Sequence, residues 1–364
     1  MVEWRKIGDI CQLERGVRVV KKDLQEEGNI PVFQNSLTPL GFYEDSNYPG
    51  NTPFVICAGA AGEIGYSNKA FWAADDCTCI VCTPLTNSKY VYYYLMVKQH
   101  ILKSQVRKAS VPRLSKEVIS KLQMPVPPLS EQNRIVGILD TFTASIENLK
   151  QQIAERRKQY EYYRDQLLDL EEKDGVEFKS LKEIVKSYCT GATPKKGTLE
   201  YYEGGTVPWL KTQDVKFNEI YAIDSYVTNE AVEKTGIKWI PANCVIIAIS
   251  GATAGRCAIN KIPTTTNQHC LNLEINPEEA LYKYVYYCVY NAYDKMISRK
   301  QGVRGDLNSS IILSIKIPVP SIQEQSCIVS ILDTFEASIA NLEAQLKQRE
   351  KQYEYYRNKL LTFE

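Results

Sequence analysis

The sequence predicts a mixed α/β protein of the α+β kind. Two sheet-and-helix domains alternate with two long helices, which form an antiparallel coiled coil with pseudo-two-fold symmetry. Three observations support this fold class. Residues 125–168 align without gaps to residues 318–361, with about 28 of 44 positions identical. Both copies carry apolar residues at spacings of three and four, as coiled-coil helices do. The stretches before them hold short apolar runs between turns rich in Gly, Asn and Pro, which is typical of strands.

The composition is that of a soluble globular protein with a net charge of +1, so an anionic partner must be bound by local patches. No stretch approaches the roughly 18 apolar residues of a membrane span, and the first residues lack the apolar core of a signal peptide. We therefore expect no membrane contact and a cytoplasmic location, where the 11 cysteines remain free thiols.

Along the chain we expect a first domain over 1–124, a first helix over 125–173, a second domain over 174–317 and a second helix over 318–364. Apolar runs predict strands near 53–57, 77–82, 244–249 and 270–275, and aromatic stretches at 90–96 and 282–288 predict helices. The second domain carries about 19 extra residues before its Gly-rich turn.

The helices are predicted by a seam that continues over more than four heptads. Its members are Leu139, Phe142, Ile146, Leu149, Ile153, Tyr160, Tyr163, Leu167 and Leu170, with Leu332, Phe335, Ile339, Leu342, Leu346, Tyr353, Tyr356, Leu360 and Phe363 in the second copy. One seam position in each copy is charged, Arg156 and Arg349, and the two are equivalent. They either fix the register of the coiled coil or extend from the edge of the seam to solvent.

Basic residues follow the aromatic stretch in both domains and predict contacts to DNA phosphates. The predicted contacts are Lys103, Arg107, Lys108 and Arg113 in the first domain and Lys295, Arg299, Lys300 and Arg304 in the second. The alternative for each run is a solvated helix face.

Motifs for catalysis and cofactors are absent from the sequence. Gly59-x-x-Gly62-x-x-Gly65 departs from the dinucleotide fingerprint and predicts a tight turn between strands, and no phosphate-binding P-loop is present. Cys77-x-Cys79-x-x-Cys82 lacks the second ligand pair of a zinc site and predicts buried thiols. We expect no catalytic residue, no metal and no cofactor in this chain.

The repeated segments resemble those of type I restriction-modification DNA specificity subunits. The resemblance lies in Pro125-Val-Pro-Pro-Leu-Ser-Glu-Gln132 leading into Ile135-Val-x-Ile-Leu-Asp140, and in the copy from Pro318 to Asp333. In the second domain Thr190-Gly-Ala-Thr-Pro194, Val207-Pro-Trp-Leu210, Gly251-Ala-Thr253 and Thr266-Asn-Gln268 are similar to that family's target-recognition domain. The first domain departs from it, with Gly59-Ala-Ala61 and Ala74-Asp-Asp76 at the corresponding places.

The resemblance implies that each domain is a target-recognition domain, which reads one half of a bipartite target in double-stranded DNA. It implies that the helices set the gap between the halves. Two DNA adenine methyltransferase subunits would dock on the chain and motor-nuclease restriction subunits would join, so that the chain itself is not an enzyme.

Loop residues near the Pro-aromatic strands and the Gly-rich turns are the candidates for reading base edges. They are Gln34 and Asn35 in the first domain and Lys211, Thr212, Gln213, Asp214 and Arg256 in the second, and mere solvation is the alternative for each. Partner docking is predicted at Glu131, Gln132, Glu324 and Gln325, in the repeated motif.

Three other functions stay open at this point. The chain could be the specificity subunit of a related restriction system with a fused methylase-nuclease chain. It could be a coiled-coil scaffold whose domains bind proteins, or a stand-alone enzyme, which the missing catalytic motifs disfavour.

Overall fold

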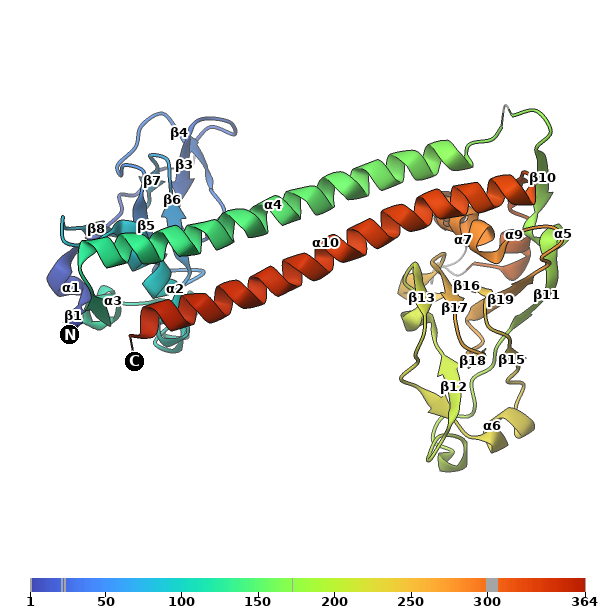
Figure 1. Cartoon of the computed structure of the whole chain (residues 1–364). Helices are drawn as coiled ribbons and strands as arrows, with labels where there is room; N and C mark the ends of the chain where they lie inside the picture. Colours follow the sequence, from blue (N-terminus) through green and yellow to red (C-terminus); the bar gives the residue numbers. More distant parts are fainter. Residues whose placement is uncertain (1, 21, 23, 172, 299–306, 364) are drawn as a thin grey trace. The chain divides into compact units, whose positions relative to one another are not determined.

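The computed structural model describes residues 2–363 except 21, 23, 172 and 299–306 (Figure 1). The chain divides into two compact units. Unit 1 contains Met1–Gln152 and Leu342–Glu364, and unit 2 contains Ile153–Asn341. Each unit therefore combines one sheet domain with part of both long helices, α4 (Leu129–Leu168) and α10 (Ile322–Thr362).

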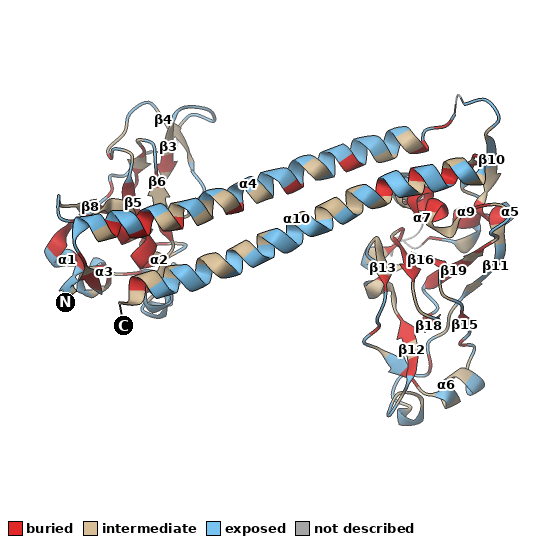
Figure 2. Ribbon diagram, in the orientation of Figure 1, coloured by how far each residue is buried: buried red, intermediate tan, exposed pale blue. Residues whose placement is uncertain are grey.

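The domain of unit 1 is built on an antiparallel sheet that buries one face against an aromatic helix. The sheet order is β2 (Cys11–Arg15), β8 (Cys77–Cys82), β5 (Thr52–Ile56) and β6 (Ile64–Ser67). Helix α2 (Ser88–Ser104) packs on it and buries Tyr90, Tyr93 and Tyr94 in one hydrophobic core with Ile7 and Ile80. Figure 2 colours the buried residues of each domain red. The predicted strands and aromatic helix of this domain are confirmed.

Unit 2 repeats this plan with an added strand. Its sheet order is β11 (Val185–Thr190), β19 (Cys270–Ile275), β16 (Val245–Ala248), β17 (Cys257–Asn260) and β13 (Asn218–Ile220), in which only the β13–β17 pair is parallel. Helix α7 (Tyr282–Asn291) supplies the buried tyrosines Tyr284, Tyr286 and Tyr287. Strands β13 and β15 (Trp239–Ile240) and helix α6 (Asn229–Lys234) lie in the stretch where the extra residues were expected.

A second, smaller sheet in each domain is centred on a parallel pair of strands. The first copy is β4 (Gly41–Tyr43), β3 (Ile30–Phe33) and β7 (Trp72–Ala73), and the second is β14 (Tyr226–Val227), β12 (Val207–Leu210), β18 (Thr264–Thr266) and β15. Gly16 and Gly191 lie against β7 and β18. A Cβ atom there would come within 2.2 Å of the Ala74 carbonyl oxygen and 1.9 Å of the Thr266 carbonyl oxygen. Only glycine permits this approach of two backbones.

Short elements join each domain to its long helix. Antiparallel pairs form between β1 (Glu3–Lys6) and β9 (Gln123–Val126), and between β10 (Glu177–Ser180) and β20 (Lys316–Val319). The remaining helices are α1 (Ile7–Ile10), α3 (Lys116–Lys121), α5 (Leu181–Ile184), α8 (Tyr293–Ile297) and α9 (Ser309–Leu313).

Within each unit the long helices run antiparallel, as predicted. In unit 1 the ring of Phe142 stacks on Tyr356 at 5.4 Å, and Lys150 pairs with Glu350. In unit 2 the Tyr160 hydroxyl donates to Glu336 at 3.1 Å, and Lys173 pairs with Glu324. The seam prediction needs two corrections. Helix α4 ends at Leu168, so the buried Leu170 lies beyond it, and α10 ends at Thr362, so Phe363 lies beyond that helix.

The two charged seam residues make reciprocal contacts with aromatic rings of the other helix. The guanidinium of Arg156 lies 5.7 Å from the ring centre of Phe335 in unit 2, and that of Arg349 lies 5.6 Å from Phe142 in unit 1. Because Phe142 and Phe335 are also equivalent positions of the repeat, one contact occurs twice. A cation–π pair at a partly exposed site contributes about 0.5–1 kcal/mol, so a role of these residues in register stays a prediction.

Candidate nucleic-acid interface

The predicted base readers of the first domain lie where three loops meet. Gln34 and Asn35 directly follow β3. The Asn35 carbonyl accepts a hydrogen bond from Ala60 N at 2.9 Å, which joins them to the Gly-rich turn between β5 and β6. The Gln34 side-chain amide donates to the carboxylate of Asp76 at 3.4 Å, in the turn before β8. These residues, distant in sequence, therefore form one surface.

A cleft of about 520 Å³, here the first cleft, opens beside this surface. Its charged lining combines four cations with two carboxylates: Arg15, Arg107, Arg113, Lys116, Asp75 and Asp76. The loop that carries Arg107 and Arg113 folds back on itself, with backbone hydrogen bonds of 2.9 and 3.2 Å between these two residues. Pro112 of the same loop accepts a hydrogen bond from Gly59 N at 3.2 Å. Two predicted phosphate ligands are thus brought next to the predicted base readers.

The other two predicted phosphate ligands of the first domain differ in their environment. Lys103, near the end of α2, pairs with Glu63 at 2.7 Å, so its charge is partly neutralised. Lys108 is exposed and, in the described part of the chain, has no carboxylate within ion-pair distance. Burial raises the pKa of the Cys57 thiol in the cleft wall, so this thiol is neutral and the charge of the cleft comes from the Arg, Lys and Asp side chains.

The predicted readers of the second domain follow β12 in a 3-10 turn, Thr212–Asp214. The Asp214 carboxylate accepts a hydrogen bond from Lys211 N at 2.9 Å, which occupies part of its acceptor capacity in the turn itself. The Lys211 ammonium lies 5.6 Å from the ring centre of Trp209. The turn contacts the Gly251–Thr253 turn, and Arg256 follows that turn half-buried.

The same backbone hydrogen bonds build the two surfaces. Ala74 N donates to Phe33 O at 2.8 Å in the first domain, as Asn267 N donates to Leu210 O at 2.9 Å in the second. Leu114 N donates to Cys57 O at 2.9 Å, as Leu307 N donates to Ile249 O at 2.7 Å. Gln34 and Lys211 therefore occupy equivalent places, although their side chains differ.

The predicted phosphate ligands of the second domain are not seen beside its predicted base readers. Arg299, Lys300 and Arg304 lie outside the described residues. Lys295, in α8, lines a different cleft of unit 2, together with the carboxylates of Asp165, Asp169 and Glu171. These carboxylates would repel a phosphate group, so the position of Lys295 does not favour a phosphate contact.

Two of the predicted docking residues, Gln132 and Gln325, are buried and form hydrogen bonds within their own units. The side chains of Gln132 and Gln325 are 0% exposed. Gln132 accepts from Asn87 N at 2.9 Å and donates to the carbonyls of Leu85 and Pro127 at 3.1 and 2.9 Å. Gln325 makes the corresponding contacts with Leu281 N and with the carbonyls of Glu279 and Pro320. Because both amides are buried with their partners satisfied inside the units, they stabilise the fold, and partner docking stays a prediction.

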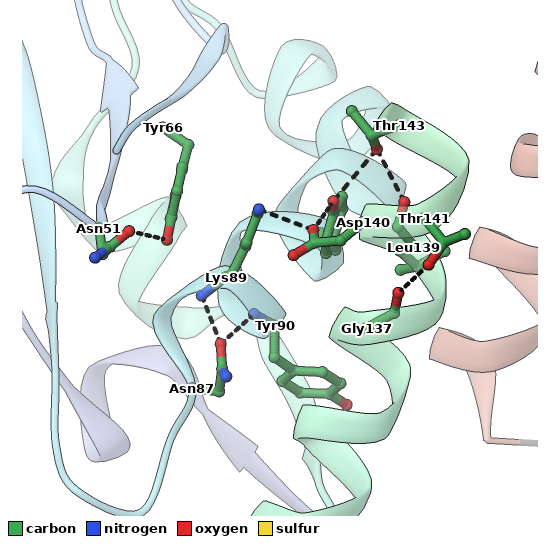
Figure 3. Close-up of polar contacts among 11 residues, drawn as sticks. Asn51, Tyr66, Asn87, Lys89, Tyr90, Gly137, Leu139, Asp140, Thr141 and Thr143 are labelled. Atoms are coloured by element: carbon green, nitrogen blue, oxygen red, sulfur yellow. Dashed lines mark hydrogen bonds and ion pairs between the residues drawn. The ribbon is translucent and has the colours of Figure 1, made fainter. Parts of the chain in front are cut away.

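These glutamines belong to a joint, repeated in both units, that fixes the long helix to the aromatic helix. In unit 1, Lys89 pairs with Asp140 at 2.8 Å between α2 and α4 (Figure 3). The Tyr93 hydroxyl donates to the same carboxylate at 2.6 Å. In unit 2, Lys283 and Tyr287 bind Asp333 at 2.9 and 2.6 Å. The sequence carried the signal for this joint, since all of these residues recur in both copies.

Sequence reasoning also missed Arg15, a cation that contacts Asp75 in the turn before β8. Its Nε donates to the Asp75 carbonyl at 2.7 Å, and its guanidinium lies 3.8 Å from the Asp75 carboxylate. Its place directly before Gly16, whose counterpart Gly191 lies in the recognised motif, was the available signal.

Metal sites and membrane-spanning helices are both absent among the described residues. Across those residues no group of three or more His, Cys, Asp or Glu side chains is arranged to hold a metal ion. None of the helices that the structure describes is long and apolar enough to cross a membrane.

Comparison with known proteins identifies the family. The type I restriction modification DNA specificity domain matches residues 1–156 and 173–351. The chain is 32% identical over 388 residues to a type I restriction enzyme specificity subunit of Escherichia coli, covering 100% of this chain and 94% of the relative. It is 24% identical over 328 residues to such a subunit of Methanocaldococcus jannaschii, covering 83% and 76%. The crystal structure of the S subunit of a type I system from M. genitalium has the same fold, with a TM-score of 0.70, 19% identity and coverage of 100% and 97%.

These matches span both domains and both helices, which the scaffold and stand-alone enzyme alternatives do not explain. The chain belongs to the family of type I restriction-modification DNA specificity subunits, the non-catalytic components of those systems.

Proposed function

We propose that each domain of this specificity subunit, residues 1–124 and 174–317, binds one half of a bipartite target in double-stranded DNA. The proposal rests on the loop surfaces around Gln34 and Lys211. The backbone hydrogen bonds of these two surfaces are equivalent, but their side chains differ. Folding alone would accept the same side chains in both. Two different half-sites require different ones, because sequence is read by the donors and acceptors that side chains present to base edges.

The proposed phosphate contacts of the first domain are Arg107, Lys108 and Arg113. Their proposed counterparts in the second domain are Arg299, Lys300 and Arg304. Replacing Arg107 and Arg113 together by Ala should weaken binding to all DNA sequences alike. It should also reduce the slope of log K against log salt by about 2, since each lost phosphate contact removes about 0.9. A Glu27→Gln variant, changed on an exposed side chain outside the first cleft, serves as control. Unchanged binding and slope at low salt would show that these residues do not contact phosphates.

Methyltransferase and motor-nuclease subunits are the proposed protein partners, with two equivalent docking surfaces on the repeated helices. Glu131 and Glu324 remain as candidates from the predicted set. The repeat also leaves Tyr162 and Tyr355 exposed, at 61% and 58%, on equivalent positions of α4 and α10. Exposed tyrosines are common anchors of interfaces. Changing both to Ser should lower the affinity for the methyltransferase subunit in calorimetric titration at least tenfold, and an unchanged stoichiometry and affinity would remove them from the interface.

The two long helices are the proposed ruler for the gap between the half-sites. One heptad inserted at equivalent positions of both helices adds about 10 Å, or about three base pairs at 3.4 Å each. Methylation mapping should then report a target whose gap has grown while both halves are unchanged. A folded, lengthened protein with the original gap would refute the ruler.

The direct test of the proposed function is a gel shift with the chain assembled with a methyltransferase subunit. Mapping of methylated adenines in cells with and without this gene supplies the target. We expect one bipartite motif that disappears with the gene. If the assembled complex binds all DNA sequences equally and modifies none, the chain does not confer sequence specificity.

A further inference from the structure

Equivalent turns of the two domains carry different hydrogen-bonding groups. The first is Ala74–Cys77, before β8, and the second is Asn267–Cys270, before β19. Cys77 N donates to Ala74 O at 2.9 Å and Cys270 N to Asn267 O at 3.2 Å. Cys57 N donates to Asp76 O at 2.6 Å and Ile249 N to His269 O at 2.9 Å. Asp75 and Asp76 therefore occupy the places of Gln268 and His269.

The fold does not require the carboxylates, because the second domain builds the same turn without them. There Gln268 bonds to Thr193 and lies 3.1 Å from the His269 ring nitrogen, so the turn carries an amide and an imidazole in place of the carboxylates. In the first domain the same two places present negative charge inside a cleft whose other charged residues are cations. Carboxylates repel the DNA phosphates that this surface must attract. Because the turn does not need them for stability, their presence indicates another role.

The two carboxylates differ in how far they are already engaged. Asp75 faces Arg15, whose guanidinium lies 3.8 Å away. Among the described residues, the Asp76 carboxylate receives one long hydrogen bond, of 3.4 Å from the Gln34 amide, so most of its acceptor capacity remains. A carboxylate can only accept hydrogen bonds at neutral pH. Among the groups that bases expose in the major groove, the N4 amine of cytosine is the donor that Asp and Glu accept from.

Resting on the proposed DNA-reading function, we propose that Asp76 is a specificity-determining residue of the first domain, which reads the N4 amine of a cytosine in the first half-site. Gln34 lies beside it and reads the neighbouring position. Arg107, Arg113 and Lys116 around the cleft hold the phosphates, which offsets the repulsion between the DNA and the carboxylate. The second domain, with His269 at this place, does not read a cytosine with this turn.

The test combines removal of the carboxylate with removal of the amine. The target of the wild-type complex is first mapped by methylation sequencing. Binding is then measured for DNA with each first-half cytosine in turn replaced by 2-pyrimidinone, which lacks the exocyclic amine. We expect one such replacement to weaken wild-type binding by about 5- to 150-fold, the range for a good base contact. The same replacement should leave the binding of the Asp76→Ala variant unchanged, because alanine has no acceptor for the amine and the interaction is already lost.

In methylation mapping, Asp76→Ala should relax one C·G pair of the first half and leave the second half and the gap intact. The control Glu27→Gln removes a charge of the same sign outside the cleft and should preserve the whole motif. The proposal is overturned if the first half contains no C·G pair, or if no amine removal affects wild-type binding. It is also overturned if Asp76→Ala keeps full discrimination, or loses binding to all sequences equally.

Binding to the DNA that contains the base analogue is measured with the wild-type protein. A variant that fails to fold therefore does not block the test. A wild-type complex without any sequence preference would instead refute the proposed function itself, which separates the two failures.

Discussion

The buried glutamine at the joint of unit 1 allows a quantitative prediction. Replacing Gln132 by Leu keeps the approximate volume of the side chain but removes its three hydrogen bonds. Asn87 N and the carbonyls of Leu85 and Pro127 are then left without that partner. A buried polar group without a partner costs about 1–3 kcal/mol. Burial of the leucine side chain returns about 1.5–3 kcal/mol. Because this cost applies to each of three groups and the return only once, we expect a net local destabilisation of about 2–5 kcal/mol.

Hydrogen exchange read by mass spectrometry measures this cost where it arises. A loss of 2–5 kcal/mol corresponds to exchange that is faster by about 30-fold to a few thousand-fold in the peptide containing Asn87 and the start of α2. Gln325→Leu is the matched variant, and it should accelerate exchange at Leu281 and the start of α7 to a similar extent. Gln166→Leu, on an exposed position of α4, should change neither.

The reasoning is refuted if Gln132→Leu leaves exchange at Asn87 within twofold of the wild type. It is also refuted if Gln132→Leu accelerates exchange equally at both joints, because each set of contacts lies inside one unit.

Three further predictions follow from the packing of the domains and helices. Burial raises the pKa of Glu336, so the folded chain holds this proton more tightly and stability falls as pH rises above about 4.5. Glu336→Gln should flatten that slope in urea unfolding between pH 4 and 8, and an unchanged slope would contradict it. Gly191→Ala should cost about 3 kcal/mol or more, because its Cβ meets the Thr266 carbonyl, whereas Gly236→Ala, with its nearest contact at 3.8 Å, should be tolerated in thermal unfolding. Phe142→Leu and Phe335→Leu should each remove a cation–π contact of about 0.5–1 kcal/mol and lower stability equally, and strongly unequal losses would disprove their equivalence.

The repeat and its hydrophobic periodicity determined the architecture from the sequence alone. The period of the apolar residues distinguishes helix from strand locally, and a gapless copy of 44 residues repeats that information. The strands at 77–82 and 270–275 were therefore predicted with their observed bounds. The end of α4 was not, because a chain can continue to bury apolar residues such as Leu170 after its helical hydrogen bonds have ended.

Only the tertiary structure decided which polar residues share a surface. Glu131 and Gln132 are neighbours in a helix. Glu131 is partly exposed and pairs with Arg134, while Gln132 is fully buried, because the aromatic helix covers a single side of α4. Arg15, Gln34, Asp76 and Arg107 meet because β2, β3, β8 and the returning loop end at one edge of the domain. Sequence fixes the donors and acceptors, but long-range strand pairing decides which of them face a common ligand.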